Sequence, residues 1–235
     1  MKKPAESGKT NLVPRILPRG RHKLDPELVA ASQRQRLLEA IVQLVAEKGY
    51  ADVTIGEIVS RAGTAKRTFY DHFSDKPQCF LAALDGISDA LVASSTRLFS
   101  SASGSVRERC EYAIRGYLEL LVSMPSAAKV FYLEAVAAGP EVVTRNHDVL
   151  LRFARGIVAL SKGAAAAGEG WELTEMHALG VVGAIHHIIH GQILRHGPDS
   201  VIEVIDGVVQ MAVGFLTVRI PSERSTTSRR RRAAR

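Results

Sequence analysis

The chain has 235 residues, 46% of them hydrophobic, and this length is enough to bury the core of one large or two small domains. Its formal net charge of +7 is unevenly placed: residues 1–36 and 219–235 each carry +6, whereas residues 37–218 carry −5. Basic ends around a mildly acidic middle favour a nucleic-acid partner, and argue against an enzyme that draws acidic substrates into a folded cleft.

The composition also disfavours membrane, secreted and metal-binding proteins. No uninterrupted apolar run reaches the ~18 residues that a membrane helix needs, and the first residues contain no apolar signal-peptide core. Cys79 and Cys110 lack metal-ligand spacing. We therefore expect a cytoplasmic protein with two reduced cysteines, no membrane contact, no cofactor and no metal.

Residues 1–31 are rich in Pro, Gly, Lys and Arg without periodic apolar positions, which predicts a disordered basic arm. The Arg19-Gly20-Arg21 core resembles an AT-hook, whose arginines insert into a narrow minor groove, although His22 replaces the proline that usually closes this motif. About ten residues separate it from the first expected helix. The alternative is a basic tail without a defined pose on DNA.

The first helix is expected from Ser32 to Lys48, where apolar residues recur on one face and Gly49 follows. Thr54 and Glu57 then form a capping box that begins a short helix. This helix is expected to end at Gly63. We expect a second short helix capped by Thr64. The residues concerned are Gly63 at the turn, Phe69 and Phe73 on the buried side, and Lys66, Arg67, Thr68 and Tyr70 on the outer side. Two short helices joined in this way are typical of a helix-turn-helix.

This region resembles the DNA-binding signature of the TetR family of transcriptional regulators. A match at several fixed spacings is more specific than a lone glycine motif. The matching positions are Thr54-Ile55, Ala62-Gly63, Thr68-Phe69-Tyr70, His72-Phe73 and Lys76. Thr64 and Ala65 depart from the family's usual β-branched apolar residue and serine, so one common DNA-contacting hydroxyl is missing.

The resemblance implies a role for each matching side chain. Lys66, Arg67 and Thr68 are expected to face the major groove, where Lys or Arg can pair with guanine and Thr can contact a base. Phosphate contacts position such a domain without reading the sequence. The remaining expected DNA contacts are Thr54, Tyr70, His72 and Lys76, with Thr64 at the turn and Arg19 and Arg21 in the arm.

Residues 32–74 are thus expected to form a DNA-binding domain, and residues 75–220 a helical body. Pro, Gly and Ser breaks divide the body into helices that end near residues 100, 124, 138, 167, 196 and 219. The prediction is an all-α fold of about nine helices. Residues 221–235 are expected to be a disordered Arg-rich tail.

The last two helices, at about 172–196 and 199–219, are apolar on more than one face, which predicts burial on both sides. In the TetR family the final two helices pair with their mates in a four-helix dimer interface. We therefore expect a homodimer, and we expect glutamate at Ile205 and Val209 to bury charge at that interface and abolish dimerisation or folding.

The resemblance also implies a body that encloses a pocket for a small lipophilic effector. Five candidates for its lining are Tyr112, Phe131, His147, Trp171 and His186. A second interpretation is a metal site, because His186 and His190 lie four residues apart on one helix face. However, the sequence offers neither a further ligand nor a nearby base.

Together these features predict a DNA-binding transcriptional regulator. It would be a repressor that binds a palindromic operator as a dimer and is released by its effector. Two alternatives remain: an architectural protein that coats A·T-rich DNA with both basic tails, and a metal-dependent enzyme that uses His186 and His190.

Overall fold

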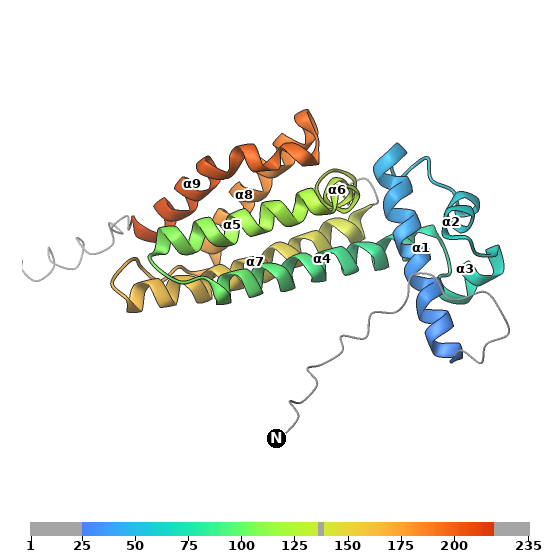
Figure 1. Cartoon of the computed structure of the whole chain (residues 1–235), viewed down its shortest axis with the longest axis horizontal. Helices are drawn as coiled ribbons and strands as arrows, with labels where there is room; N and C mark the ends of the chain where they lie inside the picture. Colours follow the sequence, from blue (N-terminus) through green and yellow to red (C-terminus); the bar gives the residue numbers. More distant parts are fainter. Residues whose placement is uncertain (1–24, 136–138, 219–235) are drawn as a thin grey trace, which may run out of the picture. The chain divides into compact units, whose positions relative to one another are not determined.

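The computed structural model describes residues 25–135 and 139–218 (Figure 1), so Arg19, Arg21 and the expected Arg-rich tail lie outside the described residues. Within the described ranges all regular structure is helical, and the all-α prediction is confirmed. The chain divides into two compact units, Met1–Ile87 and Ser88–Arg235, called here the N-terminal and C-terminal units. This division falls inside α4 (Lys76–Ser101), whereas the sequence placed a boundary between residues 74 and 75.

Helix α1 (Pro26–Lys48) begins six residues earlier than expected. The Asp25 carboxylate accepts a hydrogen bond of 3.0 Å from the amide of Glu27 and so caps the helix, and Pro26 stands at the first helical position, where its missing N–H costs nothing. Residues 26–31 are therefore helical rather than disordered. Their turn is largely exposed, so it lacks the apolar period on which the sequence prediction depended.

The core of the N-terminal unit joins α1 to α2 (Ile55–Ala62) and α3 (Lys66–His72). Leu37, Ile41, Ile58 and Phe69 are each 0% exposed. Burying one such side chain contributes about 1.5–3 kcal/mol. These few contacts therefore hold two short helices that would not be stable alone.

The C-terminal unit is a helical bundle built from the later part of α4, α5 (Val106–Ser123), α7 (Pro140–Ala166), α8 (Glu175–His196) and α9 (Ile205–Thr217). Helix α7 packs along α8, and α5 packs along α9 (Figure 1). Side chains from α4, α5, α7 and α8 meet in its interior, where the candidate effector site lies.

Two of the expected α-helices are not α-helical throughout. After α6 (Pro125–Lys129) the chain continues as a π-helical turn, η1 (Val130–Glu134), and α9 is preceded by a 3₁₀ helix, η3 (Pro198–Val204). At the start of η3 the Ser200 hydroxyl donates a 2.6 Å hydrogen bond to the carbonyl of Gly197. Such a side-chain bond competes with α-helical pairing of the backbone.

Two described helical runs, Lys76–Ser101 and Pro198–Thr217, are long and apolar enough to cross a membrane by length and composition. Neither run is uninterrupted, since Asp85 and Asp89 lie in the first and Asp199, Glu203 and Asp206 in the second, so the expectation that no uninterrupted apolar run occurs still holds. The evidence is weak for a membrane, because core helices pass the same test; α4, for example, buries Phe80 and Leu91 completely. In the second run only 33% of the most apolar window is buried within the chain, which leaves apolar surface uncovered.

Candidate functional site

Helix α3 carries the side chains that the sequence assigns to base reading. Phe69 is fully buried and fixes the helix against α1 and α2, while Lys66, Arg67 and Tyr70 are exposed and Thr68 is half-buried. The preceding turn depends on Gly63, whose φ of 62° and ψ of 42° are left-handed, a conformation that a side chain disfavours. The chain thus presents a short, firmly anchored helix with two cations and a phenol on its outer side.

Thr64 does not cap α3, contrary to expectation. The N-cap position is Ala65, which makes no side-chain hydrogen bond, and the Thr64 amide donates back to the carbonyl of Val59 at 3.0 Å. Because the backbone of Thr64 completes the end of α2, its side chain falls one residue too early to cap α3. Its Oγ1 is buried without a hydrogen-bond partner among the described residues.

Three side chains that were expected to contact phosphate have polar groups that are hydrogen-bonded or buried within the N-terminal unit. The Thr54 hydroxyl, although exposed, donates to Glu57 at 2.8 Å within the capping box, which the structure confirms. Nε2 of His72 is buried. The ammonium of Lys76 donates to the carbonyls of Val53 at 2.9 Å and Tyr50 at 3.0 Å, so we assign it to the support of the fold rather than to phosphate.

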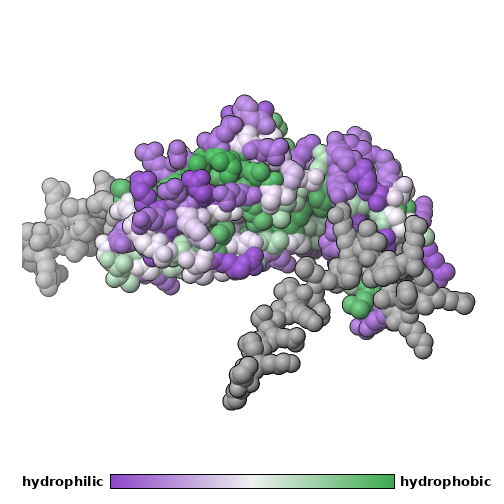
Figure 2. Space-filling model, viewed as in Figure 1, coloured by the Kyte–Doolittle hydropathy of each residue, from purple (hydrophilic) through white to green (hydrophobic). Residues whose placement is uncertain are grey.

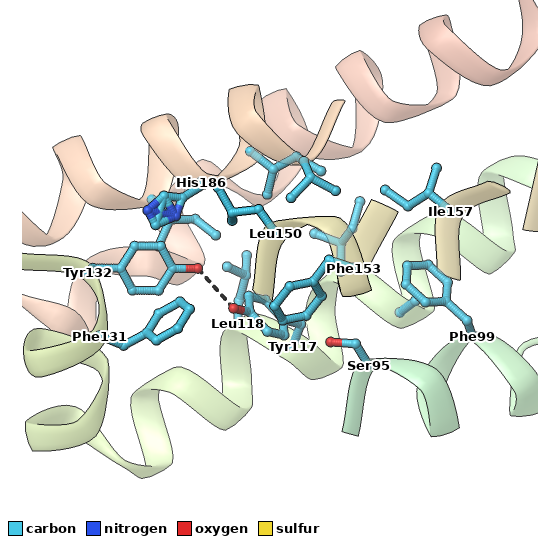
Figure 3. A pocket seen from close by; sticks show the side chains of 15 residues that line it. Ser95, Phe99, Tyr117, Leu118, Phe131, Tyr132, Leu150, Phe153, Ile157 and His186 are labelled. Atoms are coloured by element: carbon cyan, nitrogen blue, oxygen red, sulfur yellow. Dashed lines mark hydrogen bonds between the residues drawn. The ribbon is translucent and has the colours of Figure 1, made fainter. Parts of the chain in front are cut away.

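A cavity in the C-terminal unit is lined by residues of five elements (Figure 3). The volume open to the centres of water molecules is about 70 Å³. The lining is almost entirely apolar: Ser95 and Phe99 of α4; Ala113, Ile114, Tyr117 and Leu118 of α5; Phe131 and Tyr132 of η1; Leu150, Phe153 and Ile157 of α7; and Val182, Ile185, His186 and Ile189 of α8.

A small polar cluster stands at one end of this cavity. The hydroxyls of Tyr117 and Tyr132 share a hydrogen bond of 2.9 Å, and the ring of His186 stacks on that of Tyr132 with centroids 4.7 Å apart (Figure 3). Phe131 meets the same imidazole edge to face at 6.0 Å. Two successive residues of η1 thus contact one histidine, and π-helical turns of this kind frequently occur at functional sites.

The cluster is uncharged at neutral pH. Burial, and then the neighbouring His190 and His187, lower the pKa of His186 to about 4, so its imidazole is neutral. Burial raises the pKa of Tyr117 to about 12 and that of Tyr132 well above its usual value. Nδ1 of His186 is buried without a hydrogen-bond partner in the described part of the chain.

Two of the five candidate pocket residues, Phe131 and His186, line the cavity, and three do not. Tyr112 and His147 are exposed on α5 and α7. Trp171 binds the end of α9, because its Nε1 donates to the carbonyl of Phe215 at 3.1 Å and its amide donates to that of Leu216.

The sequence prediction missed Tyr117 and Tyr132, although both lie on otherwise apolar helix faces, where a buried hydroxyl needs a partner. That need was the available signal. No group of three or more His, Cys, Asp or Glu residues that could hold a metal occurs among the residues described.

The helix-turn-helix and the helical bundle can be compared with known proteins. Residues 37–83 match the family model "Bacterial regulatory proteins, tetR family". The helix-turn-helix segment, about a fifth of the chain, is therefore similar to that of the TetR family of regulatory proteins, as its motif predicts.

Sequence relatives are also regulators. The HTH-type transcriptional activator FasR of Mycolicibacterium smegmatis is 24% identical over 128 residues, which cover 54% of this chain and 58% of FasR. The uncharacterized HTH-type transcriptional regulator YerO of Bacillus subtilis is 38% identical over 53 residues, 23% of this chain and 18% of YerO. The matches thus span between about a fifth and somewhat over half of these relatives.

Solved structures share most of the fold. The fatty acid degradation regulator FadR from Bacillus halodurans superposes with a TM-score of 0.68 at 19% identity, covering 84% of this chain and all of that one. FadR from Bacillus subtilis, solved in complex with stearoyl-CoA, gives a TM-score of 0.63 at 16% identity, covering 77% and 98%. At these identities the likeness concerns the fold.

Proposed function

We propose that this protein is a homodimeric transcriptional regulator that binds a palindromic operator and is released from it by a small lipophilic effector. The observation that carries the proposal is helix α3, where Phe69 is fully buried while Lys66 and Arg67 are exposed beside it. Lys or Arg on a recognition helix can pair with guanine in the major groove.

Dimerisation through α8 and α9 is supported by their uncovered faces. Hydrophobic side chains gather over this part of the C-terminal unit (Figure 2). The outer stripe of α8 is made of small and apolar residues with one histidine: Gly180, Gly183, Ala184, His187, Gly191 and Leu194. That of α9 contains Gly207, Met211 and Gly214. A Cβ at Gly183 or Gly214 would meet no described atom within 4 Å, so a partner helix can approach closely there.

Control by an effector is supported by the cavity in the C-terminal unit. A ligand that binds one conformation of this unit more tightly than another shifts the population between them. Such coupling is typically ~1–3 kcal/mol, enough for a 5–150-fold change in DNA affinity. A mismatch between the spacing of the two recognition helices and the operator would release the DNA. The relative named as bound to stearoyl-CoA makes a lipophilic ligand a reasonable class.

Selection of bound fragments from a random DNA pool by the intact chain tests this function. We expect a palindrome whose half-sites lie about one helical turn apart. Enrichment of A·T-rich DNA without symmetry would instead favour the architectural alternative. A reporter gene with the selected site placed over its promoter then distinguishes repression from activation. Reduced expression is expected of a repressor. Increased expression would make the protein an activator, which is how the relative FasR is named.

A further inference from the structure

We propose that the cavity of the C-terminal unit takes an uncharged amphiphile, a mainly aliphatic molecule with one hydroxyl group, and rejects carboxylates and acyl-CoA thioesters. This inference rests on the proposed effector-binding function and names the chemical class of the ligand. It depends on the polar cluster of Tyr117, Tyr132 and His186 and on the charge of the remaining lining.

The lining offers no partner for a charged ligand. None of the described residues around the cavity is Lys, Arg, Asp or Glu, and the four polar ones are Ser95, Tyr117, Tyr132 and His186. An ionised carboxylate moved into such surroundings loses its hydration without gaining a counter-ion, so its binding is disfavoured. His186 does not supply the missing charge, since burial lowers its pKa to about 4.

The same cluster has unused hydrogen-bonding capacity that suits a hydroxyl. The two tyrosine hydroxyls share one hydrogen bond, so one of their two O–H donors is left over for a ligand. Nδ1 of His186 is also without a partner among the described residues. A ligand hydroxyl both donates and accepts, so it can pair with Nδ1 in either tautomer of the imidazole and with the remaining tyrosine donor.

The position of the cluster fixes the orientation of the ligand. Tyr132 and His186 lie at one end of the cavity and Phe99 and Ile157 at the other (Figure 3). A hydroxyl held between Tyr132 and His186 therefore directs an aliphatic chain along the apolar walls of α4, α5 and α7. Burial of that chain provides most of the affinity, and the cluster selects the head group.

The test compares ligands of one chain length that differ in the head group. Binding of 1-decanol, decanoate and decanoyl-CoA to the intact protein is measured at neutral pH by isothermal titration calorimetry, without DNA. We expect 1-decanol to bind at least tenfold more tightly than either of the others, because decanoate is ionised at this pH. The variant His186→Phe keeps an aromatic ring on Tyr132 but removes the nitrogen, and we expect it to weaken 1-decanol binding about tenfold.

The matched control is His147→Phe, which changes an exposed histidine of α7 outside the cavity and should leave all three affinities unaltered. Equal or tighter binding of decanoate or decanoyl-CoA, absence of 1-decanol binding, or full affinity in His186→Phe would each overturn the proposal. Operator selection without ligand is independent of these measurements, so a failure here is distinguishable from a failure of DNA binding.

Discussion

His186 links the cavity to the stability of the fold through its protonation. An unfolded histidine titrates near 6.5, whereas burial holds the pKa of His186 in the folded chain at about 4. Between these values the unfolded state binds more protons, so this histidine lowers the free energy of unfolding as the pH falls from about 6.5 to about 4. The loss over this window is roughly 2–3 kcal/mol.

We therefore predict that His186→Phe loses less stability than the wild type between pH 7 and pH 4. Urea unfolding followed by circular dichroism across this range measures the difference. His147→Phe should retain the pH dependence of the wild type, because it replaces an exposed histidine. Identical pH profiles for His186→Phe and the wild type would contradict the buried neutral imidazole.

Residues whose role depends on their own helix could be predicted from the sequence, and those whose role depends on packing could not. The outward direction of Lys66, Arg67 and Tyr70 follows from the helical period that buries Phe69. The hydrogen bonds from Lys76 to the α1–α2 loop require two segments more than twenty residues apart in the sequence to meet. Selection of the cavity lining failed for the same reason, since it depends on which faces of α5, α7 and α8 turn inward.

At the scale of elements, Lys76 connects the start of α4 to the loop between α1 and α2. Its ammonium donates to the carbonyls of Tyr50 and Val53 and lies 4.3 Å from the centre of the Tyr50 ring. Hydrogen bonds from charged groups are worth about 1.5–3 kcal/mol. In Lys76→Met we expect a loss of about 2 kcal/mol, or a fall in melting temperature of about 4–8 °C.

Differential scanning calorimetry of the intact chain measures this loss. Lys48→Met is the matched control, because Lys48 pairs with Glu57 at the surface, where ion pairs contribute little. Loss of a phosphate contact would flatten the dependence of DNA affinity on salt concentration. We expect Lys76→Met to leave this dependence unchanged. A flatter salt dependence with an unaltered melting temperature would instead show that Lys76 contacts a phosphate.

The apolar faces of α8 and α9 give a second prediction at this scale. Ile205 and Val209 are 8% and 4% exposed within one chain, so glutamates there would disrupt the fold of the monomer and test nothing about the dimer. Leu194 is 63% exposed and Met211 half-buried. We expect Leu194→Glu/Met211→Glu to yield a folded monomer, seen as a halved mass in light scattering with an unchanged helical circular dichroism spectrum.

Val143→Glu is the control for that experiment, because Val143 is a comparably exposed apolar residue on α7. It should remain dimeric. A wild-type chain that is monomeric at micromolar concentration, or a double variant that stays dimeric, would exclude this interface.

Helix boundaries were predictable wherever a local cap or break sets them. Thr54 with Glu57 and Ser105 with Glu108 both form capping boxes, and Gly197 ends α8 with a φ of 85°. The π-helical turn at η1 and the 3₁₀ segment at η3 were not predictable from the apolar pattern. Their residues keep an apolar period that an α-helix would fit equally well.

At the scale of the whole molecule, the basic arm is expected to add to DNA affinity. Helix α1 begins at Pro26, so the spacer after Arg21 is four residues long rather than about ten. The five Cα–Cα steps from Arg21 to Pro26 span at most about 18 Å. We predict that deleting residues 1–23 lowers operator affinity and flattens its salt dependence, since fewer phosphates are neutralised. Fluorescence anisotropy over a salt series measures both quantities.

A second comparison separates minor-groove binding from a simple electrostatic effect. Arg19→Ala/Arg21→Ala should lose more affinity on operators with A·T flanks than on operators with G·C flanks, because narrow A·T minor grooves attract inserted arginines. Equal losses on the two kinds of flank would reduce the arm to a basic tail.

The central claim is that α3 reads the operator, and the specificity ratio of its variants tests this most directly. The affinity of Lys66→Ala, Arg67→Ala and the wild type is measured for the selected operator and for a scrambled duplex at one salt concentration. The account predicts that at least one variant loses affinity for the operator by about 1–3 kcal/mol more than for the scrambled duplex. If both variants kept the specificity ratio of the wild type, α3 would not be the helix that reads the DNA.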